Sequence, residues 1–584
     1  MIINEAQQKL LKASKENATT EQLIWLSGYF YGLANEQGEV AQFGNTASVA
    51  PKALPNVTIL YASETGNAAG VAQQLYDHLV AQNVPVTLSN MLDYRIKGLK
   101  KESHVIIVAS TYGDGEAPDE ALTFYNALMS DKAPKLDHIS FAVFGLGDSS
   151  YDLFCQTGMD FDRRFAELGA NRLLDRVDGD VEYEEVASTW IETLSNTLLE
   201  STAQSNSIET ATSVTSTQNW SESTPFSGEL LNIIDLTDDG SEKNVWHLEI
   251  GLDESGLQYQ PGDIVALLPE NDPELVTQLI EAAGLSANET VTIKEASYTL
   301  ADALRQKLDI TSINKKLVEA YAELTGQSDI DLSDSKIKQI IEVGDFLDLI
   351  QAKPAAFSAQ ALVDLLRPLR SRQYSIASSQ AIYDDEVHVT VKQVEYKSLN
   401  RERKGVCSNW LVTLSEGDSV PLYIKPNNSF KLPKDDQAKI IMVGAGTGVA
   451  PFRSFLQQRE ADGLTGNTWL FFGEQHFRSD FLYQLEWQKY IKTGVLENIS
   501  LAFSRDQAEK IYVQNRLVEQ AETLFEWLEN GAYIYVCGDR NHMAKDVHNA
   551  FVTILVEQGK QTMEEAEAYL QDLVAQRRYQ RDVY

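Results

Sequence analysis

The sequence predicts a multidomain α/β protein with a doubly wound α/β domain at each end and an antiparallel β-barrel with a helical insertion between them. Three observations support this fold class. The chain has 584 residues, which is too long for a single hydrophobic core. Short continuous apolar runs alternate with helical stretches near both ends, as in buried parallel sheets. Alternating polar and apolar residues mark strands in the middle.

The same patterns set the domain boundaries. We predict a helical N-terminal segment at 1–54, a first doubly wound domain at 55–200, a linker at 201–224, a barrel at 225–435 with helices at about 272–368, and a second doubly wound domain at 436–584. Ten of the 18 residues at 201–218 are Ser or Thr, which favours a flexible tether. Apolar residues such as Trp25 and Phe30 either cover the first domain or form an oligomer contact.

Composition excludes several classes of function. The formal charge of −36 opposes binding to nucleic acid phosphates. This acidity could steer a basic partner protein toward the chain. General solubility or a salt-adapted proteome is the favoured interpretation. The chain shows neither an apolar run of about 18 residues nor the basic and apolar start of a signal peptide. Three distant cysteines (Cys155, Cys407 and Cys537) favour a reducing, cytoplasmic setting without a metal site.

Three loops follow the predicted strands of the first domain, so they should meet at the carboxyl edge of one sheet, where open α/β sheets bind ligands. They are YASETGNAAG (61–70), STYGDGEAP (110–118) and GLGDSSYDLFC (145–155). The first leaves backbone N–H groups free to surround a phosphate at a helix N-terminus. Tyr112 and Tyr151 in the other two can stack on a planar ring. Together the loops predict a site for flavin mononucleotide (FMN).

Two stretches of the barrel favour a second flavin. In SRQYSIASS (371–379), Arg372 can bind a pyrophosphate, Tyr374 can flank a flavin ring and Ser375 can reach its polar edge. KGVCSNWL (404–411) is a glycine turn into a helix, which is a second place for an anion. Each stretch alone is ordinary for a barrel.

The second doubly wound domain contains a glycine loop and a basic pocket. IIMVGAGTGVAPFRSFL (440–456) combines a strand, three closely spaced glycines and a helix start, so its backbone amides can face a pyrophosphate. SRDQAEKIYVQ (504–514) supplies Arg505 and Lys510, which suit a ribose 2′-phosphate. This pattern predicts NADPH in preference to NADH.

With these loops in this order, residues 57–584 resemble the NADPH-dependent diflavin reductases. Within them the chain is most similar to the flavoprotein (alpha) subunits of bacterial assimilatory sulfite reductase, through LGDSSYDLFC, NTWLFFGEQHF, DFLYQLEWQKY, YVCGDRNHMAKDV and the ending QRRYQRDVY. The resemblance implies a flavodoxin-like domain, an FAD-binding barrel and an NADP-binding domain of the ferredoxin-reductase type.

The resemblance also implies binding residues for each cofactor. For FMN these are Ser63, Glu64, Thr65, Gly66, Asn67, Ala68, Ser110, Thr111, Tyr112, Gly113, Leu146, Gly147, Asp148, Ser149, Ser150, Tyr151, Asp152, Leu153, Phe154 and Cys155. For FAD they are Arg372, Gln373, Tyr374, Ser375, Thr390, Val391, Lys392, Tyr396, Gly405, Val406, Cys407, Ser408 and Tyr584. For NADPH they are Gly446, Thr447, Ser504, Arg505, Lys510, Ile511, Tyr512, Val513, Gln514 and Asp546. Two positions depart from the family pattern: Glu64 replaces a common glutamine, and Lys392 replaces a common glycine.

The resemblance gives the chain end a role. A C-terminal aromatic residue covers the FAD ring in this family, so Tyr584 is expected to stack there and move aside for hydride transfer. Ser375, Cys537 and Asp582 are expected to form a hydrogen-bonding trio at the same place. Cys537 either steers the nicotinamide or is a small buried hydrophobic residue.

The implied function is an electron relay. NADPH would deliver hydride to FAD, and FMN would pass single electrons to a separate hemoprotein that carries siroheme and an iron–sulfur cluster and reduces sulfite to sulfide for cysteine biosynthesis. A diflavin reductase that serves another heme or cobalamin acceptor is the alternative. A scaffold role, in which the N-terminal 50 residues form a homo-oligomer, is compatible with either.

Overall fold

The structure is a computed structural model that describes residues 55–63, 66–113, 115–149, 151, 153–200, 220–327 and 330–584. The predicted N-terminal segment (1–54), most of the predicted linker, and the predicted site residues Glu64, Thr65, Ser150 and Asp152 lie outside these ranges. No helix in the described ranges is both long and apolar enough to cross a membrane.

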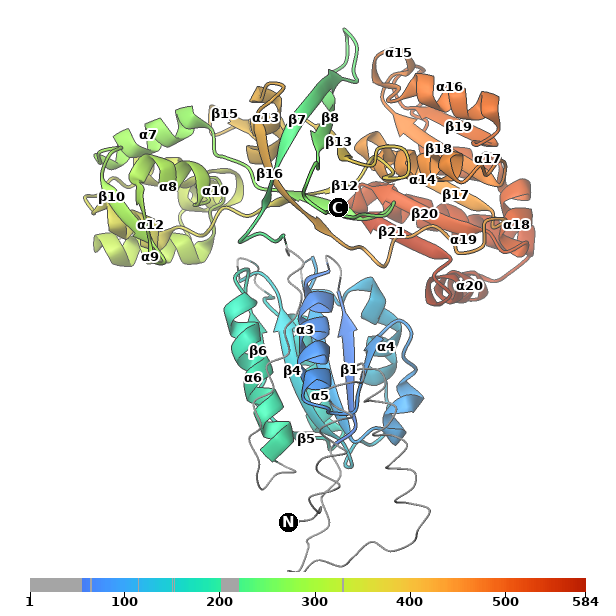
Figure 1. Ribbon diagram of the computed structural model, residues 1–584, viewed down its shortest axis with the longest axis horizontal. Helices are drawn as coiled ribbons and strands as arrows, with labels where there is room; N and C mark the ends of the chain where they lie inside the picture. Colours follow the sequence, from blue (N-terminus) through green and yellow to red (C-terminus); the bar gives the residue numbers. More distant parts are fainter. Residues whose placement is uncertain are drawn as a thin grey trace, which may run out of the picture. The chain divides into compact units, whose positions relative to one another are not determined.

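The first domain is a parallel sheet with helices on both faces (Figure 1). The strands run in the order β2-β1-β3-β4-β5, and β6 also pairs with β4. The strands are β1 (Val57–Ala62), β2 (Val86–Asn90), β3 (His104–Ser110), β4 (Ser140–Leu146), β5 (Asn171–Arg172) and β6 (Val177–Gly179). The helices are α3 (Asn67–Ala81), α4 (Leu122–Met129), α5 (Gln156–Glu167) and α6 (Glu184–Glu200), with short 3-10 helices η1 (Ile96–Lys101) and η2 (Asp119–Ala121).

Alternate residues of each buried strand face different helices of this domain. Ile107 and Val143 share a core with Phe124 of α4 and Phe161 of α5. Phe144, the next residue of β4, lies on the opposite face, where its ring centre is 5.0 Å from that of Trp190 in α6. Strands buried on both faces read as continuous apolar runs, which is why β1, β3 and β4 were predictable.

The middle domain contains a six-stranded antiparallel sheet in the order β12-β9-β16-β7-β8-β13. Its strands are β7 (Phe226–Asp235), β8 (Val245–Gly251), β9 (Ile264–Leu267), β12 (Arg372–Ser375), β13 (Glu386–Lys392) and β16 (Ser419–Lys425). Strand β7 bridges the two halves because it pairs with β16 through Phe226–Glu229 and with β8 from Leu230 to Asp235, with a bulge between Leu230 and Asn232. The helix α13 (Val406–Thr413) follows the two-stranded hairpin of β14 (Glu395–Ser398) and β15 (Arg401–Lys404).

The predicted barrel is not closed by a regular ladder. The edge strands β12 and β13 are joined by one isolated bridge between Ile376 and Val389, so among the described residues the fold is an antiparallel sheet rather than a closed barrel. Alternating polarity predicts which strands pair and bury one face. Closure depends on strand tilt and stagger, which that pattern does not encode.

A helical block interrupts this domain between β9 and β12. Its helices are α7 (Pro273–Ala283), α8 (Leu300–Gln306), α9 (Lys315–Thr325), α10 (Ser335–Val343), α11 (Phe346–Ala352) and α12 (Ala359–Leu365), with a hairpin of β10 (Thr290–Ile293) and β11 (Ala296–Thr299). The helices enclose their own apolar core around Tyr321 and Phe346. Arg403 binds both Asp345 and Asp348, which attaches the β14–β15 hairpin to α11. The predicted helical insertion is therefore present.

The C-terminal domain is a second parallel sheet in the order β19-β18-β17-β20-β21. Its strands are β17 (Ile440–Ala445), β18 (Thr468–Glu474), β19 (Asn498–Phe503), β20 (Tyr533–Gly538) and β21 (Tyr579–Val583). Its helices are η3 (Gly446–Val449), α14 (Ala450–Ala461), α15 (Phe477–Asp480), α16 (Gln484–Thr493), α17 (Val513–Glu519), α18 (Ala521–Glu529), η4 (Arg540–Ala544), α19 (Lys545–Gly559) and α20 (Met563–Ala575).

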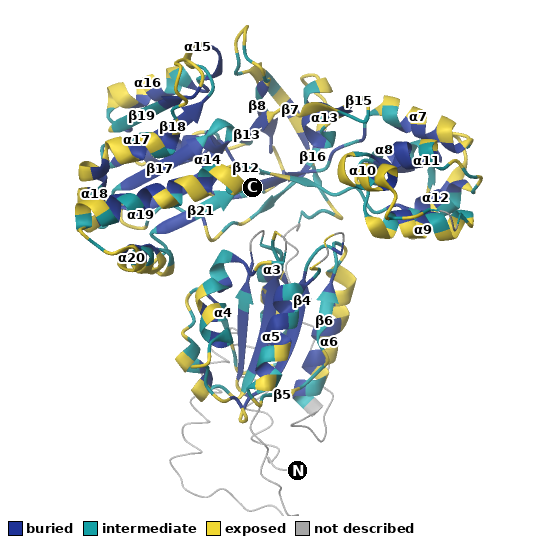
Figure 2. Ribbon diagram, turned by 180° about the vertical axis from the view of Figure 1, so that it is seen from behind, coloured by how far each residue is buried: buried dark blue, intermediate teal, exposed yellow. Residues whose placement is uncertain are grey.

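Strand residues of this domain also divide between two cores. Ile441 packs with residues of α17 to α20, whereas Met442 packs with Phe455 of α14 and Trp487 of α16. Figure 2 shows the central strands β17, β18 and β20 as mostly buried and the outer sides of the helices as exposed. Strand β21 was not predicted, and it places the chain end beside β20 through the pair Cys537 and Asp582.

Candidate functional site

The first loop of the flavodoxin-like domain leads into α3. Gly66 precedes this helix with φ of +81°, a conformation that other residues rarely adopt. The Ser63 hydroxyl accepts a hydrogen bond from the backbone N–H of Ala68 at 3.1 Å, so Ser63 orders the start of the helix. Gly66 has no side chain to cap the helix, and a helix start of this kind suits a phosphate.

The second and third loops line a cavity of about 650 Å³. Nine predicted FMN residues border it: Thr111, Tyr112, Gly113, Gly147, Asp148, Tyr151, Leu153, Phe154 and Cys155. Tyr151 is 54% exposed, so its ring is available for stacking. Cys155 is fully buried, and burial raises the pKa of its thiol. A neutral thiol at the bottom of the cavity acts as packing rather than as a nucleophile.

A second cavity, of about 580 Å³, is lined by residues of the antiparallel sheet and of the C-terminal domain, and also by residues of the first domain such as Ser63 and Tyr112. The predicted FAD residues that line it are Arg372, Gln373, Tyr374, Ser375, Thr390, Lys392, Gly405, Val406, Cys407, Ser408 and Tyr584. The helix α13 begins here without a side-chain cap, so its first N–H groups face the cavity beside the cation of Arg372. A cation, an open helix start and an aromatic ring fit a dinucleotide with a pyrophosphate and a flat ring.

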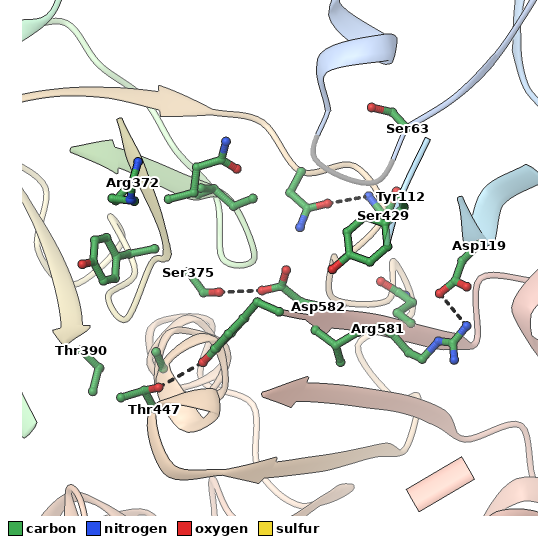
Figure 3. A pocket seen from close by; sticks show the side chains of 18 of the residues that line it. Ser63, Tyr112, Asp119, Arg372, Ser375, Thr390, Ser429, Thr447, Arg581 and Asp582 are labelled. Atoms are coloured by element: carbon green, nitrogen blue, oxygen red, sulfur yellow. Dashed lines mark hydrogen bonds and ion pairs between the residues drawn. The ribbon is translucent and has the colours of Figure 1, made fainter. Parts of the chain in front are cut away.

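The three residues of the predicted trio lie close together, and Figure 3 shows two of them, Ser375 and Asp582, joined by a hydrogen bond beside this cavity. The Ser375 hydroxyl donates to a carboxylate oxygen of Asp582 at 2.6 Å, and the Cys537 thiol lies 3.9 Å from the same oxygen. Burial raises the pKa of Asp582, and these two hydrogen bonds oppose the rise. Burial also raises the pKa of Cys537, whose side chain is fully buried. Cys537 does not border the cavity, whereas Ser375 and Asp582 do.

The terminal side chain of the chain lies over the same cavity. Backbone bonds of Tyr584 to Gly538 and Arg540 fix its main chain, and its hydroxyl is 3.1 Å from that of Thr447. Its side chain is nevertheless 61% exposed. A fixed backbone with an exposed ring is what a movable cover requires.

The glycine loop between β17 and α14 is built for close backbone approach. A Cβ at Gly448 would lie 2.2 Å from the carbonyl oxygen of Cys537, so only glycine fits there. Thr447 from this loop lines the cavity that Tyr584 covers. The loop therefore joins the predicted NADPH segment to the predicted FAD site.

The predicted 2′-phosphate pocket is only partly assembled. Ser504 and Arg505 lie side by side after β19, and Gln514 donates to Asp546 at 3.0 Å. The Arg505 guanidinium is paired with Glu242 from the β7–β8 turn. A phosphate at Arg505 must compete with this carboxylate, which sequence reasoning did not anticipate.

Some predicted residues do not present their side chains to a site. Val391 and Val513 are buried in apolar cores, so only their backbones are available. Tyr396 is 54% exposed on β14 and does not border the FAD cavity. Side chains alternate between the two faces of a strand, which explains why Val391 does not border the cavity while its neighbours Thr390 and Lys392 do.

Comparison with known proteins gives matches across the whole chain. A flavodoxin model matches residues 59–190, an FAD binding domain model matches 218–410, and an oxidoreductase NAD-binding domain model matches 442–549. The sulfite reductase (NADPH) flavoprotein alpha-component of Salmonella typhimurium is 46% identical over 591 residues, covering 100% of this chain and 98% of that protein. The proteins of the same description from Bacillus subtilis and Aliivibrio fischeri are 45% and 44% identical over 597 and 592 residues, again covering 100% and 98%.

The chain belongs to the sulfite reductase flavoprotein alpha-component family. This confirms the resemblance inferred from the motifs. The order of flavodoxin, FAD-binding and NAD-binding domains also confirms the predicted fold class, apart from closure of the barrel. These domains support FMN, FAD and NADPH as the cofactors of this oxidoreductase.

Two residues of this family member were missed by sequence reasoning. The Arg540 guanidinium lies 3.4 Å from the centre of the Tyr112 ring, and Arg581 pairs with Asp119 at 2.5 Å. Both arginines stand in motifs that carry the resemblance, YVCGDRNH and RRYQRDVY, so a signal was present. Their partners lie more than 400 positions away, which no local pattern reveals.

Proposed function

We propose that this chain is the electron-transfer flavoprotein of an NADPH-dependent sulfite reductase. The supporting observation is the FAD cavity, where Arg372, Thr447 and Tyr584 from three separate segments line one space. When bound, FAD accepts hydride from NADPH, and FMN converts the electron pair to single-electron transfer. The partner in this proposal is a hemoprotein that carries siroheme and an iron–sulfur cluster.

The protein's own residues have separate tasks in this proposal. The Arg372 guanidinium and the start of α13 bind the FAD pyrophosphate. The Ser375 hydroxyl donates its hydrogen bond to the Asp582 carboxylate, and this bond orients both groups toward the nicotinamide. The Tyr584 ring excludes water until the nicotinamide displaces it. The three loops of the flavodoxin-like domain bind FMN through backbone amides and through Tyr112 and Tyr151.

The proposal has two further parts. The three cysteines are free and buried, which supports a reducing, cytoplasmic setting. A homo-oligomer formed through the N-terminal segment, which lies outside the described residues, is supported by the apolar residues of that sequence, among them Trp25 and Phe30.

Sulfite-dependent oxidation of NADPH tests the function. We expect sulfite to stimulate NADPH oxidation only when the hemoprotein is present, with one sulfide formed for every three NADPH because each NADPH carries two of the six electrons. The measurement pairs NADPH absorbance with sulfide determination. A chain that reduces ferricyanide with NADPH but shows no sulfite response with the hemoprotein would instead serve another heme or cobalamin acceptor.

A further inference from the structure

One buried arginine connects the glycine loop to both strands that line the FAD cavity. Arg453 lies in the first turn of α14, directly after that loop, and is 3% exposed. Its Nε donates to the Glu486 carboxylate at 2.9 and 3.0 Å. One terminal nitrogen donates to the carbonyl oxygen of Ala377 at 2.8 Å and to Nδ1 of His388 at 3.2 Å. The guanidinium thus bonds to three separate segments.

The first connection runs along β12. Ala377 is two residues beyond Ser375, the residue that donates to Asp582. The next turn of α14 strengthens this contact. The Gln457 side chain there accepts a buried hydrogen bond from the backbone N–H of Ser379 at 2.9 Å. The position of α14 is therefore tied to the strand that presents Ser375.

The second connection runs through β13 and a buried tyrosine. The Arg453 guanidinium lies 5.0 Å from the ring centre of Tyr483. The Tyr483 hydroxyl is 2.6 Å from the hydroxyl of Thr390 and 2.9 Å from Nδ1 of His247. His388 and Thr390 are two residues apart on one strand, so they share a face. Thr390 lines the FAD cavity, and its position depends on this network.

The same cluster has the composition of a metal site but not its chemistry. Ligand atoms of His247, Glu249 and His388 lie within 4.8 Å of one another. However, Nδ1 of His388 accepts from Arg453, and Nδ1 of His247 is bonded to Tyr483. Burial, together with the charge of Arg453, lowers the pKa of His388 to about 2, so this ring stays a neutral acceptor. The guanidinium is the cation of this cluster, and no metal ion is needed.

We propose that Arg453 is a positioning residue for hydride transfer, holding the glycine loop at a fixed distance from the strands that line the FAD cavity. The inference rests on the proposed function, because it assumes that NADPH lies on that loop and FAD in that cavity. A planar guanidinium fixes direction as well as distance, which a flexible ammonium does not. Misplacement of reacting groups by about 1 Å costs on the order of 100-fold in rate.

Arg453→Met in the full-length holoprotein is the direct test, with flavin bleaching by saturating NADPH followed by stopped flow. We expect the bleaching rate to fall about 10- to 100-fold. The dissociation constant of NADP⁺, measured by calorimetry, should change less than about threefold, because Arg453 does not touch the predicted 2′-phosphate residues. Arg453→Lys keeps the charge but not the planar geometry and should give an intermediate rate.

Arg459→Met is the matched control. Arg459 is on the same helix and is also 3% exposed, but its hydrogen bond to the carbonyl oxygen of Gly466, at 3.1 Å, stays within the C-terminal domain. This variant should lose stability while keeping the bleaching rate. Tyr483→Phe removes one hydroxyl without changing the shape of the core, so it tests the same network if Arg453→Met does not fold. It should slow bleaching several-fold.

The outcomes separate this inference from the proposed function. The inference is overturned if Arg453→Met and Tyr483→Phe bleach at the wild-type rate, or if Arg459→Met slows bleaching as much as Arg453→Met. It is also overturned if the rate and the NADP⁺ affinity fall together. Failure of NADPH to bleach the flavin in the wild-type protein would contradict the proposed function itself.

Discussion

Replacing Arg505 and Lys510 together by alanine should lower kcat/KM for NADPH about 100-fold and leave kcat/KM for NADH within about threefold. Both cations follow β19, where the sequence predicts the ribose 2′-phosphate. A charge-assisted hydrogen bond at an exposed site contributes about 1.5 kcal/mol, so two correspond to about 100-fold. NADH has no 2′-phosphate and loses neither contact. Steady-state kinetics with both cofactors measures the ratio.

Two variants sharpen this experiment. Lys489→Ala removes a surface cation that pairs with Glu460 at 2.6 Å outside the predicted pocket, and it should change neither constant. Glu242→Gln removes the carboxylate that pairs with Arg505, so it should lower KM for NADPH alone, by a few-fold at this exposed pair. An equal loss with NADPH and NADH in the double variant would refute the 2′-phosphate pocket.

Replacing Tyr584 by alanine should raise kcat/KM for NADH about tenfold. The Tyr584 ring lines the cavity into which the nicotinamide enters in the proposed function, and displacing a stacked aromatic ring costs about 1.5 kcal/mol. NADPH offsets this cost through its 2′-phosphate contacts, whereas NADH has none. Alanine keeps the backbone bonds of the last residue to Gly538 and Arg540. The ratio of the two kcat/KM values is the readout.

Tyr584→Phe is the control for the Tyr584→Ala prediction. It keeps the ring and loses only the hydroxyl that contacts Thr447, so its cofactor preference should stay close to wild type. If phenylalanine relaxed the preference as much as alanine does, the hydroxyl contact rather than the ring would control access. No gain with NADH in the alanine variant would remove the cover role of Tyr584.

The parallel sheets were predictable because burial on both faces is written into the local sequence. HVIIVAS and KIIMVGAG give β3 and β17 directly. The strand β21 escaped prediction because YQRDV is short and mostly polar, and its place depends on the neighbouring β20. The middle sheet was predicted to close into a barrel, but within the described residues it is not closed by a regular ladder. Closure could not be predicted for the same reason, since it is a property of six strands together.

Some residues of the candidate site were likewise predictable from the local sequence, whereas the contacts that fix them were not. Thr447 was predictable because it belongs to a glycine loop that follows a parallel strand, and Arg372 and Ser375 were predictable because a cation and a hydroxyl beside a tyrosine suit a flavin nucleotide. The pairing of Arg505 with Glu242, and the contacts of Arg453 with Ala377 and His388, join residues far apart in the chain. Local patterns carry no information on such contacts, so only the folded chain reveals what fixes the geometry.

The flavin content of the purified, fully reconstituted protein tests the central claim most directly. Flavins released by acid, separated by HPLC and related to protein concentration should give one FMN and one FAD per chain, because nine predicted FMN residues line one cavity and eleven predicted FAD residues line the other. A preparation that binds only one kind of flavin after exposure to both would contradict an electron relay within this chain.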